Sequence, residues 1–166
     1  MMKVALSQGY VALVDEQDMP RISLHAWWIL KKKRKDGSLY LRAFTTIKRK
    51  TILMHRFILE APLDAQVDHL DFDALNNRRA NLRICNGSQN SAHNRACGKL
   101  GFRGVSLRHH TKDGRPRYRA EVSHHGVVTR GALYDEPIAA AREYDAIASK
   151  IHGKFAFINF PAETSV

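Results

Sequence analysis

The sequence predicts an α+β protein in which two β-rich segments each lead into a helix. Residues 67–95 read as strand, polar loop, strand and helix, and residues 102–151 read as three short strands and one amphipathic helix. With 44% hydrophobic residues, the composition favours a packed core over a disordered chain. At 166 residues the chain is long enough for one ordinary domain or two small ones.

The N-terminal part alternates short apolar stretches with turn residues, which is typical of short strands. Strands are expected at Lys3–Ser7, Tyr10–Val14 and Ser38–Phe44. The apolar stretch 51–59 could be a strand that runs into a short helix, and periodicity alone does not decide this. The adjacent Trp27 and Trp28 are expected in the core rather than stacked on bases.

Residues 67–90 read VDHLDFDALNNRRANLRICNGSQN and hold five asparagines, three aspartates and one histidine. Asparagine forms helices and strands poorly, so this density indicates specific polar roles. We expect strands at Val67–Leu70 and Leu82–Ile84, with a helix over residues 87–95. The Asp-His pair at the end of the first strand is the candidate reactive centre.

The side chains of this stretch suit metal-assisted chemistry on a phosphate. Asp68 offers a hard oxygen ligand for Mg²⁺, and Asn90 offers a second through its amide oxygen. His69 could accept a proton from water near neutral pH. Two protein ligands would leave metal positions open for water and a phosphate oxygen.

The net charge of +11, from 27 Lys and Arg against 16 Asp and Glu, favours a polyanionic partner, nucleic acid before membrane. A merely basic soluble protein is the alternative. No apolar run approaches the ~18–20 residues that span a bilayer, and the start, MMKVALSQGY, lacks a signal-peptide core. With two cysteines and no CxxC pair, neither a disulfide framework nor a Cys-based zinc site is expected. We therefore expect an intracellular protein without membrane contact.

The C-terminal part follows a different pattern. Strands are expected at Phe102–Arg108, Arg117–Ser123 and Val127–Leu133, and a helix at 135–151 capped by Asp135. The apolar face of that helix comprises Ile138, Ala141, Tyr144, Ala148 and Ile151. Residues 99–130 hold eight Lys and Arg against two acids, a net +6, whereas 131–166 hold three against five, a net −2. The strands are thus the basic side of this segment.

The pattern D-H-x-D-x(4)-NNR-x(2)-N-L-R-x(6)-N resembles the HNH nucleases, and is most similar to phage and intron-encoded HNH homing endonucleases. MHRFILEAP, at 54–62, resembles the His-Arg segment upstream of that motif. The resemblance implies a strand–strand–helix metal site for hydrolysis of double-stranded DNA with a divalent ion, Mg²⁺ or else Mn²⁺, and no structural zinc. It implies that His69 is the general base, that Asp68 and Asn90 bind the metal, and that Asn81 ties the loop and orients the base. Arg78 and Arg79 would meet phosphates, and His55 could support the site, contact phosphate or sit in the core.

Residues 101–161 resemble the ethylene-response-factor (APETALA-type) DNA-binding domain, through FRGV, the Ala-Glu-Val of the second strand, AAAREYDAIA and the closing NFP. The resemblance implies a three-stranded antiparallel sheet packed on one helix, with the sheet in the DNA major groove. The groove and phosphate contacts would be Arg103, Arg108, Arg117, Arg119 and Arg130. Some of these arginines could instead only keep an exposed sheet soluble.

Together, the two resemblances predict a nuclease domain at 1–97 and a DNA-binding domain at 98–166. The expected activity is a site-directed, metal-dependent endonuclease of the homing type, which as a monomer or weak dimer nicks one strand per monomer. One alternative is a non-catalytic DNA-binding regulator with a silent HNH remnant. Another is an HNH nuclease that acts on RNA or without sequence specificity.

Overall fold

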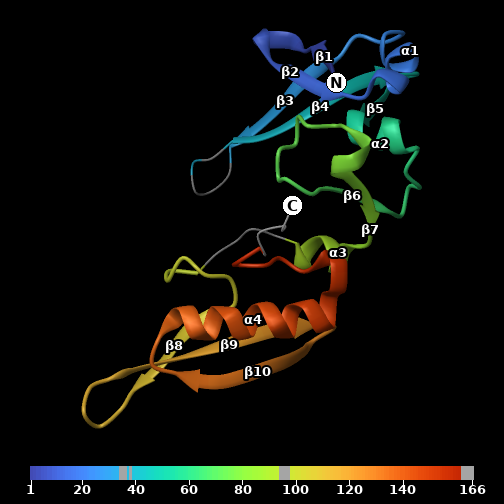
Figure 1. Ribbon diagram of the computed structural model, residues 1–166. Coiled ribbons are helices and arrows are strands. Elements are labelled where there is room, and N and C mark those ends of the chain that lie inside the picture. Colours follow the sequence, from blue (N-terminus) through green and yellow to red (C-terminus); the bar gives the residue numbers. More distant parts are fainter. Residues whose placement is uncertain (34–36, 38, 94–97, 162–166) are drawn as a thin grey trace. The chain divides into compact units, whose positions relative to one another are not determined.

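In a computed structural model of the chain, residues 1–33, 37, 39–93 and 98–161 are described. The fold is α+β, as predicted, with four small antiparallel sheets, the last of which packs on the C-terminal helix (Figure 1). The chain forms two compact units, Met1–Asn86 and Gly87–Val166. Within the described ranges, no helix combines the length and apolar character needed to cross a membrane.

The first unit consists of two hairpins, a three-stranded sheet and short helices. Its first hairpin pairs β1 (Met2–Ala5) with β2 (Val11–Val14), and α1 (Met19–Ile22) follows. The middle sheet has the order β3 (Trp28–Lys33), β4 (Leu39–Ile47) and β5 (Lys50–Leu53). After α2 (Met54–Leu59), the second hairpin pairs β6 (Gln66–His69) with β7 (Leu82–Cys85).

The core of this unit gathers apolar side chains from both hairpins, from β3 and β4 of the middle sheet and from the short helices, which is why such short strands hold together. Ile22, Met54 and Ile58 are at most 1% exposed, and they pack with Ile29 of β3 and Val67 of β6. The apolar stretch 51–59 is a strand end followed directly by α2. Because α2 joins the core, it places its residues beside β6.

The tryptophan pair is divided between core and surface, so the expectation that both are core residues is wrong for one of them. Trp27 is buried, and its Nε1 donates a hydrogen bond to the Ile22 carbonyl at 2.9 Å. Trp28 is 41% exposed beside the ring of Phe44. Adjacent residues of a strand point to opposite faces, so burial of one exposes the other.

The second unit begins with α3 (Gly87–Ala92) and continues into a hairpin sheet of order β10-β9-β8. Its strands are β8 (Val105–His110), β9 (Pro116–His124) and β10 (Val127–Tyr134). The long helix α4 (Pro137–His152) follows. The sequence predicts a helix to residue 95, and residues 94–95, together with Cys97 at the predicted domain boundary, lie outside the described residues.

Helix α4 covers one face of this sheet. Ala120 and Val122 of β9 pack against Tyr144 and Ala148 of the helix. At Gly104, with a φ of +66°, an added Cβ would collide with the Tyr144 ring, so the close approach of chain and helix requires glycine there. The opposite face of β9 is not covered by α4.

Two details of α4 differ from the sequence prediction. The helix begins at Pro137 with Glu136 as its N-cap residue, whereas Asp135 accepts a hydrogen bond from Arg117 at 2.6 Å. Asp135 is therefore an ion-pair partner and not the cap. Ile138 is 48% exposed and lies outside the buried face, where Ala140 is found instead.

Candidate active site

The Asp-His pair ends β6 and is buried in the first unit. Asp68 and His69 are 8% and 5% exposed, and in the hairpin they stand opposite Arg83 and Leu82 of β7. Because neighbouring strand residues alternate in direction, the two side chains meet different surroundings. The carboxylate faces Arg83, and the imidazole faces α2 and the connecting loop.

Asn81 ties the polar loop between β6 and β7. Its Oδ1 accepts the Asp71 backbone N–H at 3.0 Å, and its Nδ2 donates to Oδ1 of Asp71 and to the Asn76 carbonyl, each at 2.8 Å. Asn76 donates to the other Asp71 oxygen at 2.6 Å. Burial alone would raise the pKa of the Asp71 carboxyl, but hydrogen bonds from Asn76, the Asp73 backbone and Asn81 outweigh it and lower the pKa.

His69 lies between the loop and α2. Its Nε2 is 3.5 Å from Oδ1 of Asn77, and its ring meets that of His55 edge to face at 5.1 Å. Burial and then the charge of Arg42 lower the pKa of His69, and Asn77, Asp71 and Asp68 oppose this shift. The imidazole is therefore neutral at neutral pH, which is the state that accepts a proton.

His55 is a buried residue of α2 that contacts His69. It is 4% exposed, and burial, followed by the charges of His69, Arg42 and Arg56, lowers its pKa to about 3. It is therefore buried beside His69, and its role in the proposed site remains a prediction. The charge of Arg42 on β4 lowers the pKa of both histidines. Nothing in the sequence pointed to this residue beyond its position in a predicted strand.

Asp68 is already engaged in an ion pair. The Nε and Nη2 atoms of Arg83 lie 2.9 and 2.7 Å from its Oδ2, and both side chains are largely buried. In the described part of the chain, no three His, Cys, Asp or Glu side chains are grouped so that they could hold a metal ion. Asn90, the other predicted metal ligand, lies on α3 in the second unit. Its role and that of Asp68 remain predictions.

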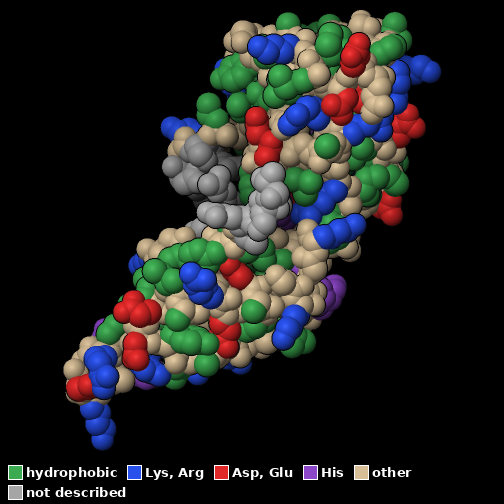
Figure 2. Space-filling model, viewed as in Figure 1, with side chains coloured by type: hydrophobic (Ala, Val, Ile, Leu, Met, Phe, Trp, Pro, Cys, Tyr) green, Lys and Arg blue, Asp and Glu red, His purple; other side chains and the backbone are tan. Residues whose placement is uncertain are grey.

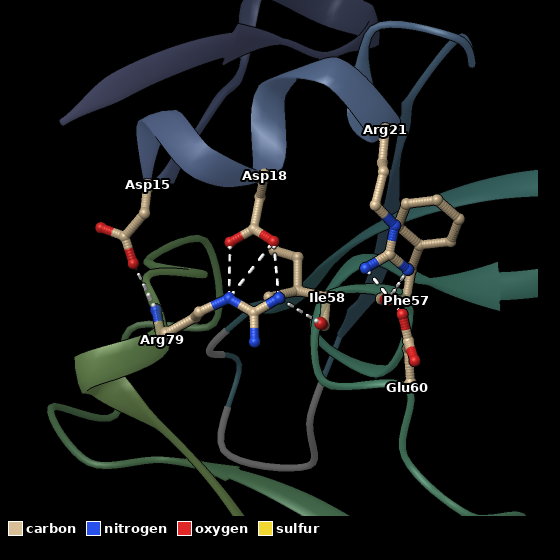
Figure 3. A network of polar contacts seen from close by, with 7 residues as sticks. All are labelled: Asp15, Asp18, Arg21, Phe57, Ile58, Glu60 and Arg79. Carbon is tan, nitrogen blue, oxygen red and sulfur yellow. Dashed lines mark hydrogen bonds and ion pairs between the residues drawn. The ribbon is translucent and has the colours of Figure 1, made fainter.

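Arg79 is bound inside the first unit, as Figure 3 shows. Its Nε and Nη2 atoms donate to the Asp18 carboxylate at 2.7 to 3.3 Å, and Nη2 also donates to the Ile58 carbonyl at 3.0 Å. Its backbone N–H donates to Asp15 at 2.8 Å. The Arg79–Asp18 ion pair joins the β6–β7 loop to the segment after β2. This structural role of Arg79 was not predicted from the sequence. The partners are 61 residues apart, so no local pattern links them.

Arg78 is turned toward the same loop, where its Nε donates to Oδ1 of Asn76 at 3.0 Å. The DNA contacts expected of Arg78 and Arg79 remain predictions.

The arginines of the second unit divide between two surroundings. Arg103 lies toward α3 and α4, because its Nε donates to the Tyr144 hydroxyl at 2.8 Å and its Nη2 to the Ser91 carbonyl at 2.9 Å. Arg108 and Arg130 pair with Glu121 at 3.5 and 3.2 Å. These three therefore have partners within the unit.

Arg117 and Arg119 alternate with the buried Ala120 and Val122 along β9, so they belong to the face opposite α4. Arg117 pairs with Asp135 at 2.6 Å. Arg119 stands on the central strand, opposite Ser106, and its buried Nε meets no hydrogen-bond partner within the described residues. Acidic side chains are visible around α4, and basic ones at the tip of the β8–β9 hairpin (Figure 2).

The chain is similar to a protein of Acanthamoeba polyphaga mimivirus described as an uncharacterized HNH endonuclease. The two are 28% identical over 159 residues, which cover 92% of this chain and 76% of the viral protein. No established protein-family profile and no solved structure matches the chain. This distant similarity suggests the nuclease superfamily, and it extends over both compact units.

Proposed function

We propose that the protein is a divalent-metal-dependent DNA endonuclease of the HNH type. The observation that carries this proposal is the environment of His69. Its buried, neutral imidazole follows Asp68 at the start of the β6–β7 loop, in which Asn81 and Asp71 are hydrogen-bonded to each other. The similarity, over most of the chain, to a protein described as an uncharacterized HNH endonuclease supports it. A neutral histidine in a polar loop is suited to removing a proton from an attacking water.

In this proposal His69 is the general base and its neighbours set its orientation. Donation from Nε2 to Asn77 would leave Nδ1 as the nitrogen that accepts the proton. His55 packs against the ring and restricts its rotation. Asn81 acts through the loop, because its side chain bonds Asp71 and Asn76.

Asp68 and Asn90 are proposed to hold the divalent ion, with Mg²⁺ preferred and Mn²⁺ as a substitute. A carboxylate and an amide oxygen are hard donors, so their chemistry fits such an ion. When bound, the ion would polarise the scissile phosphate and stabilise the leaving oxygen. Because Arg83 donates two hydrogen bonds to Oδ2 of Asp68, the ion would have to share this carboxylate with the guanidinium.

The second unit is proposed to bind double-stranded DNA through the sheet face opposite α4. Arg108, Arg117, Arg119 and Arg130 would supply the phosphate and base contacts, with Arg119 at the centre of the face. Arginine can bond guanine bidentately, which is worth ~1–3 kcal/mol of discrimination. The proposal includes a functional boundary between residues 97 and 98. It also includes a homing type of action, in which each monomer nicks one DNA strand.

One observation favours the alternative of a non-catalytic DNA-binding regulator. The Asp68 carboxylate is held by Arg83, and a positive charge so close opposes a divalent ion at the same carboxylate. Cleavage itself distinguishes the two functions, because a regulator would bind DNA and leave it intact.

The test is plasmid cleavage with Mg²⁺ by the wild type and by His69→Ala. We expect the wild type to nick the plasmid and the variant to be slower by ~10²–10⁴-fold, the usual contribution of a general base. DNA binding, measured by fluorescence anisotropy, should be the same for both proteins. Equal cleavage by the variant would refute the role of His69, and no cleavage by the wild type would favour the regulator.

A further inference from the structure

A polar cleft of about 430 Å³ lies in the second unit, among α3, the end of β9 and the last turns of α4. Its volume falls within the ~300–1,000 Å³ of small-ligand sites, but its walls are more polar than is usual for such sites. Figure 2 shows histidine side chains in purple near the end of α4, which Figure 1 labels. The cleft lies on the α4 side of the sheet, because it is lined by Val122 and Tyr144, which pack together there.

Three histidines from different elements meet in the cleft. The His124 ring, at the end of β9, lies 4.0 Å from the His125 ring in the turn and 5.1 Å from the His152 ring at the end of α4. Nδ1 of His124 is buried and has no hydrogen-bond partner within the described residues. A buried polar atom without a partner is unfavourable, which indicates that something from solution completes the site.

Arg103 adds a fixed positive charge. The hydroxyl of Tyr144 and the carbonyl of Ser91 accept hydrogen bonds from its guanidinium, so the charge is held at the cleft. Burial, and then the charges of His124, Arg103 and His125, lowers the pKa of His152. The cleft thus gathers groups that repel one another when protonated, and an anion among them would remove that repulsion.

Few acidic groups lie near this positive charge. Among the described residues that line the cleft, Glu121 is the only acid. Its carboxylate pairs with Arg130 at 3.2 Å and with Arg108 at 3.5 Å. Ser88 of α3 also lines the cleft, and a serine hydroxyl can donate a hydrogen bond to an anion.

We propose that this cleft is a binding site for a phosphate group, held by Arg103 and by the imidazoles of His124, His125 and His152. Imidazolium and guanidinium donors with nearby hydroxyls are the groups that recognise phosphate oxygens. The phosphate could belong to a free phosphate monoester or to a DNA strand, and the chemistry of recognition is the same for both. The site is independent of the cleavage reaction proposed for His69.

The test follows the imidazole signals of the 166-residue chain by NMR while inorganic phosphate is added at constant ionic strength. We expect saturable shifts for His124, His125 and His152, and none for His109 on the exposed part of β8. Shifts that grow without saturation, or that chloride reproduces, would refute the site.

Variants of matched chemistry sharpen this experiment. His124→Gln should weaken phosphate binding by about tenfold or more, as expected for loss of a hydrogen bond to a charged group. His109→Gln should leave it unchanged, and an equal loss in both variants would overturn the assignment. If circular dichroism shows that His124→Gln is unfolded, His125→Gln in the exposed turn takes its place with the same expectation.

Two further ligands identify the source of the phosphate. A deoxynucleoside monophosphate represents the free monoester, and a duplex without terminal phosphates represents the DNA backbone. Shifts of the three histidines with the duplex would assign the cleft to backbone phosphates, and shifts with the monophosphate alone would assign it to a small ligand. Both outcomes support the site, and no shift with either ligand or with inorganic phosphate would contradict it.

Discussion

Asn81 and Asp71 bind each other reciprocally: the amide of Asn81 accepts the Asp71 backbone N–H at 3.0 Å and donates to its carboxylate at 2.8 Å. Asn81 is 7% exposed, so few water molecules could replace these bonds. These hydrogen bonds link the two ends of the loop that follows His69. Loss of either residue should therefore affect both folding and the proposed active site.

Replacement of Asn81 should destabilise the first unit through this pair. Asn81→Ala removes the donor to the Asn76 carbonyl and one of the donors to the Asp71 carboxylate, and we expect a loss of about 1–3 kcal/mol in the free energy of unfolding. Urea denaturation measures this loss. Asp71→Ala and the double variant complete a double-mutant cycle, and strictly additive effects would show that the two residues do not act together.

Arg79 should matter more for stability than the neighbouring Arg21, which also appears in Figure 3. Arg79→Ala leaves Asp18, whose side chain is 3% exposed, without its cation. We expect a loss of about 2–3 kcal/mol, below the ~3–5 of a fully buried pair because Arg79 is 39% exposed. Arg79→Lys should not restore it, because lysine lacks the planar fork.

The matched control is Arg21→Ala. Arg21 pairs with the 72% exposed Glu60, so we expect a loss of about 1 kcal/mol or less. Denaturation curves of both variants under the same conditions make the comparison. A larger loss in Arg21→Ala than in Arg79→Ala would contradict this account of the network.

The buried His55 should make the protein sensitive to acid. Its pKa is about 3 in the folded state against about 6.5 when unfolded, so between these values the unfolded chain binds a proton that the folded protein does not. Stability should therefore be complete above about pH 6.5 and fall as the pH is lowered. His55→Gln removes this titration, and its urea midpoint should change less between about pH 7 and pH 5. Identical pH dependence in both proteins would contradict the assignment.

Gly104 should be required by the close approach to α4. In Gly104→Ala the new Cβ meets the Tyr144 ring and keeps an unfavourable positive φ, so we expect a loss on the order of 2–4 kcal/mol. Gly126→Ala has a comparable φ of +79° but open space around its Cβ, so strain alone of about 1–2 kcal/mol is expected. Thermal denaturation should separate the two variants, and equal losses would argue against the steric explanation.

Local patterns predicted the second unit more closely than the first. Apolar alternation and turn residues located β8, β9, β10 and α4, because each of these elements depends on neighbours in sequence. The sequence predicts Asp135 as the helix cap, whereas in the structure it pairs with Arg117. Arg117 lies 18 residues away in the sequence, so no local pattern indicates this ion pair. Trp28 was misplaced because an apolar residue type does not reveal which strand face is buried.

The sequence proposed residues for the candidate site but none of the contacts that surround them. The spacing of polar residues singled out Asp68, His69 and Asn81 through a family resemblance. The ion pairs that hold Asp68 and Arg79 join segments distant in sequence, so nothing in the local pattern specified them. The same holds for Arg42, whose effect on His69 and His55 arises only when β4, α2 and β6 pack together.

The most direct test of the proposed mechanism is chemical rescue of a His69 variant. His69→Gly removes the imidazole and opens a space where it stood, so imidazole added to the solution could take its place as base. Single-turnover cleavage of plasmid DNA with Mg²⁺ should be lost in the variant and recovered in part with increasing imidazole, while the wild type is unaffected. Cleavage by His69→Gly at the wild-type rate without imidazole would contradict the role of His69 as general base.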